Sequence, residues 1–413
     1  MPLPLSNITV LDLSRILAGP WCSQLLADLG ATVIKIEHPA RGDDTRGWGP
    51  PFLRDKDGVE TGEAAYYLGV NRNKQSVAVD FTQPEGQAIL LALAAQADVM
   101  IENYKVGGLK KYGLDYDSVC GANPKVVYCS ITGFGQTGPY ANNAGYDFMI
   151  QGMGGLMSVT GERDDLPGGG PQKVGVAVSD IMTGLYATVG IQAALMHRDR
   201  TGVGQHIDMA LLDTQVAMIA NLNMNYLISG VVPGRMGNAH ANIVPYQAFP
   251  TSDGHVILAV GNDGQFEKFC QIANRPDLGD DPRFRRNADR VRHREILVPI
   301  VAALIKGRTT REWTSACDGA QVPCGPINRL DQVFADRQVV HRQMRIDLPH
   351  PLSGTVPQVV NPLKFSQTPL EYHSAPPLLG QHTAGVLAER LGYDETRIVE
   401  LAARNVIAVN RES

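Results

Sequence analysis

One carboxylate stands apart among the residues that could do chemistry. Asp180 lies in the stretch KVGVAVSDIMTGLYATVGI, at residues 173–191, where every close neighbour is small or apolar. A helical pattern is expected from Asp180 to His197. Because an aspartate in front of a helix is a favoured N-cap, Asp180 has a structural explanation as well as a chemical one. Ser179 has the same capacity to cap.

Two basic loops carry the other informative groups. Arg41 and Arg46 lie in the glycine-flanked segment HPARGDDTRGWG, and residues 71–74 read NRNK in front of a predicted strand. Guanidinium groups bind phosphate through paired, charge-assisted hydrogen bonds. Internal Asp–Arg pairing in a solvated turn explains the first loop equally well. Two basic loops on successive crossovers nevertheless favour a polyanionic ligand.

The surrounding elements alternate between strand and helix. Helical periodicity appears at 19–30 and 84–97, and strand-like runs appear at 7–14, 31–37, 74–81, 98–104 and 124–135. This pattern predicts right-handed βαβ units in an open, doubly wound, Rossmann-like α/β sheet. The basic loop after Glu37 then lies at the carboxyl edge of the sheet, where such folds bind ligands.

The first βα turn excludes two common nucleotide sites. Where a GxGxxG motif would cradle a phosphate, residues 14–20 read SRILAGP, with one glycine and a proline that lacks an amide donor. No GxxxxGK[ST] motif occurs in the chain. The sequence therefore supports neither dinucleotide binding nor P-loop phosphoryl transfer.

The bulk composition narrows the class of protein. The 413 residues are 44% hydrophobic and 19% charged, with a net charge of −5, which does not suggest a nucleic-acid partner. The N-terminus shows no signal or transit peptide, and no membrane-spanning run is apparent. Six scattered cysteines without CxxC pairs indicate reduced thiols and a cytoplasmic location. No metal site is expected.

A change of pattern near residue 230 predicts a second domain. A TSDG turn separates two β-rich runs, and helical segments follow it. We expect a large α/β domain at 1–224, a smaller α+β domain at 225–328, and a return of the chain to the large domain at 329–413.

The ordered motifs of the chain resemble those of the class III CoA-transferases, the CaiB/BaiF type. The likeness runs from about residue 5 to 400, and residues 237–254 with 376–383 look closest to the branch that acts on succinyl-CoA and glutarate. It is carried by SRILAGP, IKIEHPARGDDTR, NRNKQSVAVD, IENY, YCSITGFGQTGPY, VAVSDIMTG, GVGQHIDMALLD, VPCGPI and PPLLGQHT. The resemblance implies an obligate homodimer of interlocked protomers.

The resemblance also implies site residues. On the substrate side it implies Arg15, Tyr146, Arg235 and His240. Leu17 and Thr132 replace residues of the formyl-CoA branch, which speaks against a small oxalate-like acceptor. The residues implied to contact CoA are Leu17, Ala18, Arg41, Arg46, Asn71, Arg72, Asn73, Lys74, Asn103, Tyr104, Lys111, Thr132, Gly133, Phe134 and Gly135.

By the same resemblance, Asp180 matches the family's nucleophile. Its carboxylate attacks an acyl-CoA, forming a mixed anhydride and then an aspartyl-CoA thioester, from which a free acid takes the CoA. Small neighbours leave room for a thioester, and free amides at the helix start would stabilise developing oxyanions. We expect succinyl-CoA as donor and glutarate or a related dicarboxylate as acceptor. The CoA thioester is a substrate, and no permanently bound cofactor is expected.

Two alternatives stay open. The same fold supports α-methylacyl-CoA racemase, whose histidine lies in an AGHD-type segment, but Tyr146 occupies that position here. A tyrosine with a pKa of about 10 is a poor general base at neutral pH. The other alternative is a CoA-binding protein without catalytic activity.

Overall fold

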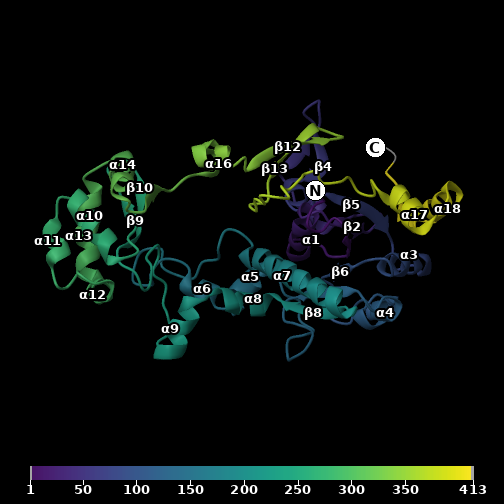
Figure 1. The fold of residues 1–413 in the computed structure, drawn as a ribbon, viewed down its shortest axis with the longest axis horizontal. Coiled ribbons are helices and arrows are strands. Elements are labelled where there is room, and N and C mark those ends of the chain that lie inside the picture. The colour runs from purple at the N-terminus through teal and green to yellow at the C-terminus, as the bar shows by residue number, and fades with distance from the viewer. Residues whose placement is uncertain (1, 411–413) are drawn as a thin grey trace. The chain divides into compact units, whose positions relative to one another are not determined.

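The structure is a computed structural model, and it describes residues 2–410. The chain divides into two compact units. Among the described residues, the first comprises 2–155, Val174–Met224 and 340–410, and the second comprises Leu156–Lys173 and Asn225–Val339. The elements of each unit are labelled in Figure 1.

This division differs from the expected domains in two places. Residues 156–173 lie with the second unit, and that unit extends to Val339 rather than to residue 328. The segment is held there by the amide of Gly237, which donates to the carbonyl of Gly161 at 3.0 Å, and by an ion pair between Arg235 and Asp164. An irregular segment has no periodicity that would reveal which unit it packs on.

A seven-stranded sheet, counted over residues 2–410, forms the centre of the first unit. Its order is β14–β5–β2–β1–β6–β7–β8, and every neighbouring pair is parallel except β14 with β5. The strands are β1 (Thr9–Asp12), β2 (Thr32–Glu37), β5 (Lys74–Val79), β6 (Val99–Glu102), β7 (Val127–Thr132), β8 (Gln205–Ala210) and β14 (Ile407–Ala408). The expected large parallel sheet is confirmed. The order reverses between β1 and β6, the place where open α/β sheets bind ligands.

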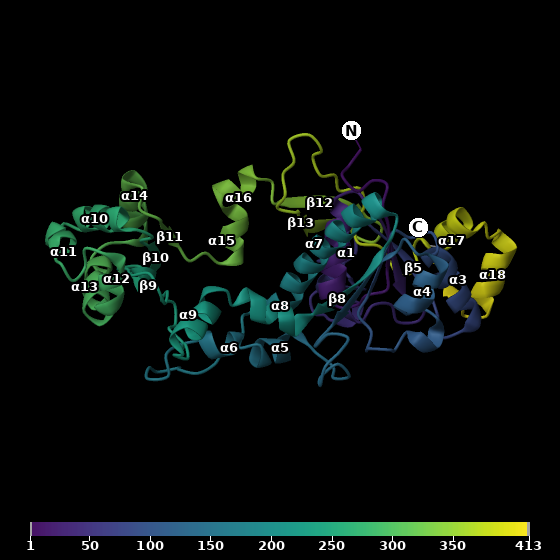
Figure 2. The same cartoon turned by 60° about the horizontal axis from the view of Figure 1, so that its bottom comes forward.

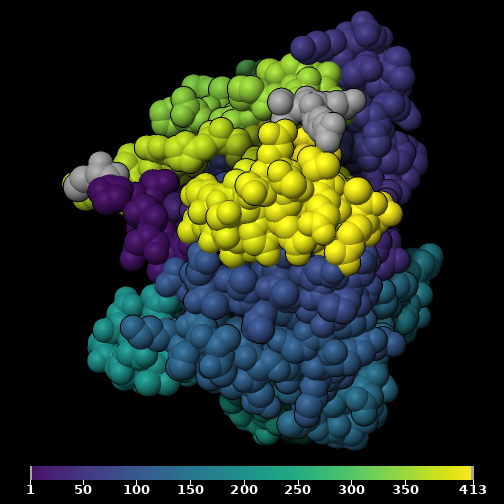
Figure 3. All heavy atoms as spheres, turned by 90° about the vertical axis from the view of Figure 1, so that its right-hand side faces the viewer, coloured from purple at the N-terminus to yellow at the C-terminus, as the bar shows by residue number. Residues whose placement is uncertain are grey.

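Helices cover both faces of this sheet. On one face α1 (Ala18–Asp28) packs beside α7 (Val178–Thr201), with Val10, Val99 and Val127 in the core beneath them (Figures 1 and 2). The other core is covered by α3 (Pro84–Ala94), α4 (Tyr116–Ala122), α17 (Thr383–Leu391) and α18 (Glu395–Ala403). Figure 3 shows the yellow C-terminal helices lying against the blue segments that contain α3 and α4.

Shorter elements complete the first unit. The hairpins β3–β4 and β12–β13 are antiparallel, and Tyr67 and Leu68 pack against Leu348 and Val356. The elements are β3 (Phe52–Arg54), β4 (Glu60–Ala64), β12 (Arg345–His350), β13 (Gly354–Val359), η1 (Asp44–Gly47), η2 (Lys110–Tyr112), α2 (Ala65–Leu68), α5 (Asp147–Met153) and α8 (Leu211–Met218).

The second unit is α+β, with a three-stranded antiparallel sheet among its described residues. Its order is β11–β10–β9, and Phe266, Phe269 and Trp313 lie in its core. Its elements are β9 (Tyr246–Pro250), β10 (His255–Ala259), β11 (Cys324–Pro326), α6 (Leu156–Val159), α10 (Asp263–Ile272), α11 (Pro276–Asp280), α12 (Asn287–Arg292), α13 (Arg294–Lys306), α14 (Thr310–Ala320) and α15 (Leu330–Ala335). Two helices, α9 (Asn221–Ser229) and α16 (Arg337–His341), cross the division. No helix formed by residues 2–410 is both long and apolar enough to cross a bilayer.

Candidate active site

A cavity of about 530 Å³ lies in the first unit, at the carboxyl ends of the central strands. Its wall contains residues 15–18 after β1, residues between 36 and 43 at the end of β2 and after it, residues 103–106 after β6, and residues 131–133 at the end of β7. This is the edge of the sheet at which its strand order predicts a ligand. The volume suits a small-molecule site.

Many of the sequence-predicted residues line this one cavity. They come from separate loops, so the fold brings together side chains up to 165 positions apart. The predicted residues in the wall are Arg15, Leu17, Ala18, Arg41, Asn103, Tyr104, Lys111, Thr132, Gly133, Tyr146 and Asp180.

Asp180 does not cap its helix. The helix α7 begins at Val178, two residues earlier than expected, so Asp180 lies within its first turn. Asp147, at the start of α5, accepts hydrogen bonds from the amide of Ser179 at 2.8 Å and from the amide of Asp180 at 3.4 Å. The capping interpretation of Asp180 and Ser179 is therefore wrong, because a carboxylate 33 residues earlier in the chain takes that role.

Two consequences follow from the Asp147 cap. The carboxylate of Asp180 has no hydrogen-bond partner among residues 2–410 and faces the cavity. The amides of Ser179 and Asp180 are already occupied, so they are not free to stabilise an oxyanion, as the sequence had suggested. No local sequence signal connects Asp147 to α7.

Burial raises the pKa of the Asp180 carboxyl to about 7, and the negative charge of Asp147 adds to the effect. The same environment includes Tyr66, which the sequence did not indicate. Burial and then the charge of Asp180 raise the pKa of Tyr66 to about 12. Asp180 therefore lies in a poorly solvated place where it titrates near neutral pH.

A close contact between two helices fixes the place of Asp180. Gly184 is one turn further along α7, and a Cβ atom built on it would lie 2.6 Å from the carbonyl oxygen of Ala18 at the start of α1. Residues four apart lie on the same face of a helix. The helix face that carries Asp180 therefore packs directly on the start of α1, where Leu17 and Ala18 line the cavity.

Three of the predicted cations in the cavity wall are accessible to a ligand. Arg15 pairs with Asp44 at 2.9 Å and lies over the ring of Tyr104, and both partners of this ion pair are partly exposed. Neither Arg41 nor Lys111 makes an ion pair within residues 2–410, although Lys111 lies 4.6 Å from the centre of the Tyr112 ring. These groups can neutralise an anionic ligand.

Three cations predicted to contact CoA are instead paired with carboxylates of the protein. Arg46 forms paired bonds to Glu37 and Glu63, each with a shortest distance of 2.8 Å. Arg72 pairs with Asp28 at 2.5 Å, and Lys74 lies 3.4 Å from Asp12, and all three cations are buried. Their charges are compensated by carboxylates that lie outside each basic loop, between 9 and 62 positions away along the chain. The sequence of each loop alone does not reveal these partners.

Four further residues predicted to contact CoA lie outside the cavity wall. Asn71 accepts from Lys74, and Asn73 accepts from the amides of residues 373 and 374, so both serve the packing of the loop. Phe134 packs on the core beside α7, and the amide of Gly135 donates to Thr132. These contacts give the four residues structural roles, and a CoA contact for them stays a prediction.

Arg235 and His240 belong to the second unit. Arg235 forms an ion pair with Asp164. His240 accepts a hydrogen bond from the amide of Asn242, and its ring meets the Tyr246 ring edge-on, with 5.2 Å between the ring centres. A substrate role for these two residues stays a prediction.

Comparisons with known proteins identify the family of the chain. The model of CoA-transferase family III matches residues 5–383. The chain is 54% identical to the succinate–glutarate CoA-transferase of Agrobacterium fabrum, covering 94% of this chain and 95% of that protein. It is 43% identical to the human succinyl-CoA:glutarate CoA-transferase, covering 98% and 90%. A crystal structure of a CaiB/BaiF family protein from Brucella suis superposes with a TM-score of 0.82 at 50% identity, covering 94% of this chain and all of that one.

Proposed function

The chain belongs to CoA-transferase family III, and from that membership we propose that it transfers CoA from succinyl-CoA to glutarate. The observation that carries the proposal is the carboxylate of Asp180, which lacks a hydrogen-bond partner among the described residues and faces the cavity at the sheet edge. The names of the relatives at 43–54% identity support this donor and acceptor.

The first half-reaction begins when an oxygen of Asp180 attacks the thioester carbonyl of succinyl-CoA. The carbon–sulfur bond breaks, CoA leaves as a thiolate, and a mixed succinyl–aspartyl anhydride remains. The thiolate then attacks the aspartyl carbonyl of the anhydride. Succinate leaves, and an aspartyl-CoA thioester remains on Asp180.

The second half-reaction repeats these steps in reverse. A glutarate oxygen attacks the aspartyl-CoA carbonyl, releasing the thiolate and forming a glutaryl–aspartyl anhydride. The thiolate attacks the glutaryl carbonyl, which gives glutaryl-CoA and regenerates the carboxylate of Asp180. Because each acyl bond replaces one of comparable reactivity, no other energy source is needed. The poor solvation of Asp180 supports this series of reaction steps, because water would hydrolyse the anhydride and thioester intermediates.

Different residues of the cavity wall are suited to bind CoA and to bind the acid. Arg41 and Lys111 are suited to the phosphates of CoA, with Asn103, Tyr104, Thr132 and Gly133 along its length. Arg15 and Tyr146 are suited to the acid being transferred, because they line the cavity together with Asp180. The racemase alternative has less support, because Tyr146 lies where that activity requires a histidine base.

A homodimer and a cytoplasmic location are further parts of the proposal. Large apolar side chains are exposed on α7 and α9, among them Val189 and Ile228, and exposure of this kind marks protein interfaces. Interlocked protomers follow from the family resemblance. All six cysteines are free thiols in the described chain, which supports a reducing compartment.

The test combines product analysis with trapping. The protein is incubated with succinyl-CoA and a panel of free acids, and mass spectrometry identifies the CoA esters. We expect glutaryl-CoA, and hydroxylamine should modify Asp180 only after acyl-CoA is added. Asp180→Ala should abolish both results, whereas Asp213→Ala, which removes an exposed first-turn carboxylate of α8, should leave both intact.

Exchange of an α-hydrogen without any CoA transfer would replace the proposal by the racemase alternative. CoA binding with neither reaction would favour a non-catalytic protein.

A further inference from the structure

The turn at residues 14–17 connects β1 to α1 and forms part of the cavity wall. Arg15, Ile16 and Leu17 all line the cavity, and the turn ends where α1 begins at Ala18. The shape of this short turn therefore decides what the cavity presents beside Asp180.

Ile16 has a backbone conformation that its side chain disfavours. Its φ angle is +72°, in the left-handed region. A β-branched residue is rarely found there, because its branched Cβ crowds the backbone. Such a conformation persists only when the surrounding structure holds it, and it is concentrated at functional sites.

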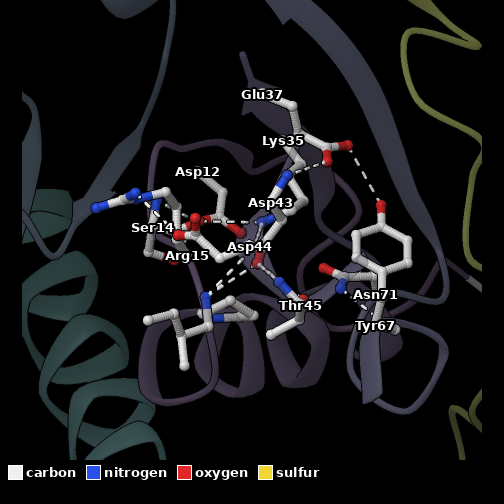
Figure 4. A network of polar contacts seen from close by, with 12 residues as sticks. Asp12, Ser14, Arg15, Lys35, Glu37, Asp43, Asp44, Thr45, Tyr67 and Asn71 are labelled. Carbon is white, nitrogen blue, oxygen red and sulfur yellow. Dashed lines mark hydrogen bonds and ion pairs between the residues drawn. The ribbon is translucent and has the colours of Figure 1, made fainter. Parts of the chain in front are cut away.

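Side chains from outside the turn hold its backbone (Figure 4). The ammonium of Lys35 donates to the carbonyl of Ser14 at 3.0 Å, and the carboxylate of Asp43 accepts from the amide of Ile16, with both oxygens 3.3 Å away. Asn103 binds both backbone groups of Arg15, at 2.9 and 2.7 Å. The backbone of three successive residues is thus fixed by residues of other strands and loops.

Lys35 and Asp43 form a pair that solvent does not reach. Their charged atoms are 2.8 Å apart, and both side chains are 0% exposed. Thr45 orients Asp43 further, since its amide donates at 3.0 Å and its hydroxyl at 2.7 Å. Burial alone would raise the pKa of Asp43, but the charge of Lys35 and these bonds outweigh it and lower the pKa to about 2. The pair therefore stays charged at neutral pH.

Stability alone does not account for this arrangement. Replacing a buried ion pair by apolar residues of similar size is often neutral or stabilising. What distinguishes the Lys35–Asp43 pair is that both partners bind the backbone of the strained turn.

We propose that Lys35 and Asp43 are positioning residues of the transfer site. Their ion pair holds the turn at residues 14–17 in the left-handed conformation at Ile16, and so presents Arg15, Ile16 and Leu17 to the bound acyl-CoA. Without the pair, Ile16 relaxes to a negative φ and the cavity wall beside Asp180 changes shape. This inference rests on the proposed function.

The test is a double-mutant cycle between substitution of the Lys35–Asp43 pair and substitution of Ile16. Lys35→Met/Asp43→Leu removes the pair without leaving an unpaired buried charge. We expect kcat/KM of the folded protein for succinyl-CoA and glutarate to fall at least tenfold. Ile16→Gly accepts a positive φ without strain, and its own effect on kcat/KM is measured separately because Ile16 lines the cavity. In the pair variant, Ile16→Gly should restore most of the loss. Circular dichroism and thermal melting give the folded fraction.

A matched control removes another buried pair. Asp28→Asn breaks the pair with Arg72, which contacts neither the turn nor the cavity. It should lower the melting temperature, leave kcat/KM of the folded fraction within twofold, and show no coupling to Ile16→Gly. If the pair variant is insoluble, Thr45→Val replaces it in the cycle, because this change loosens Asp43 and keeps the ion pair.

Independent effects of the pair variant and Ile16→Gly would overturn the inference, as would full activity of the folded pair variant. A wild-type protein that transfers CoA to no acid would instead overturn the proposed function. Calorimetric titration with CoA separates the two cases further. We expect CoA to bind the pair variant more weakly, and Ile16→Gly to restore its affinity.

Discussion

At the scale of single residues, Asp147 sets the properties of Asp180. It caps α7 through the amides of Ser179 and Asp180 and thereby frees the Asp180 carboxylate from capping. Its negative charge also opposes ionisation of Asp180, which burial already disfavours. A nucleophilic carboxylate must be ionised, so pH and Asp147 should both control the rate.

The pH dependence of transfer tests this relation. We expect kcat/KM for succinyl-CoA to rise with pH and to level off above about 7, because the pKa of Asp180 in the free protein is raised to about that value. In Asp147→Asn the amide oxygen still caps α7, but the repulsive charge is gone, so the acid limb should move to lower pH. An unchanged limb would show that another group controls it.

Stability gives a second measurement at the same residue. Because the folded pKa of Asp180 is raised above its usual 3.8, folding favours the protonated form, and stability is lost as pH rises towards 7. Asp180→Asn should therefore stabilise the substrate-free protein at pH 8 by about 1–3 kcal/mol, and much less at pH 4. Chemical denaturation at the two pH values measures this, with Asp213→Asn expected to show no such difference.

At the scale of elements, the contact between α1 and α7 joins two parts of the site. Gly184 lets α7 approach the carbonyl of Ala18, and this approach brings Asp180 to the cavity wall formed by residues 15–18. An internal glycine destabilises a helix, so the presence of Gly184 at this close contact has a packing reason.

Two glycines of α7 test this contact. Gly184→Ala would place its Cβ 2.6 Å from backbone oxygen, so the helices must separate, and we expect a lower melting temperature and a loss of at least tenfold in kcat/KM. Gly190→Ala is the matched control, because its nearest neighbour outside the helix backbone is a side-chain atom of Ile207 at 3.7 Å. It should keep full activity and gain up to about 1 kcal/mol. Equal behaviour of the two variants would contradict the role of the contact.

At the scale of the whole molecule, the exposed apolar side chains bear on assembly. Leu227 and Ile228 of α9 are 70% and 79% exposed in the single chain, and Val231 and Val232 follow them with similar exposure. Apolar residues gathered in this way are costly in water unless another surface covers them.

Charge substitutions on α9 test the proposed homodimer. Leu227→Glu/Ile228→Glu should shift the protein from dimer to monomer or to aggregate in light scattering after size exclusion, because a charge buried in an apolar interface is unfavourable. Val399→Glu, at an exposed position of α18, should leave the dimer intact. A wild-type protein that is monomeric at all concentrations would contradict the proposal.

The sequence by itself determined the large parallel sheet, because alternating apolar periodicities dictate βαβ units, and its ordered motifs determined the family. Through the family resemblance it also indicated Asp180 and part of the cavity wall, including Arg15, Asn103 and Thr132. Only the tertiary structure decided which charges are available to a ligand. Arg46, Arg72 and Lys74 resemble Arg41 and Lys111 in sequence, yet their partners Glu63, Asp28 and Asp12 are distant along the chain. The cap that frees Asp180 and the strain at Ile16 depend likewise on contacts between remote segments, which local patterns do not encode.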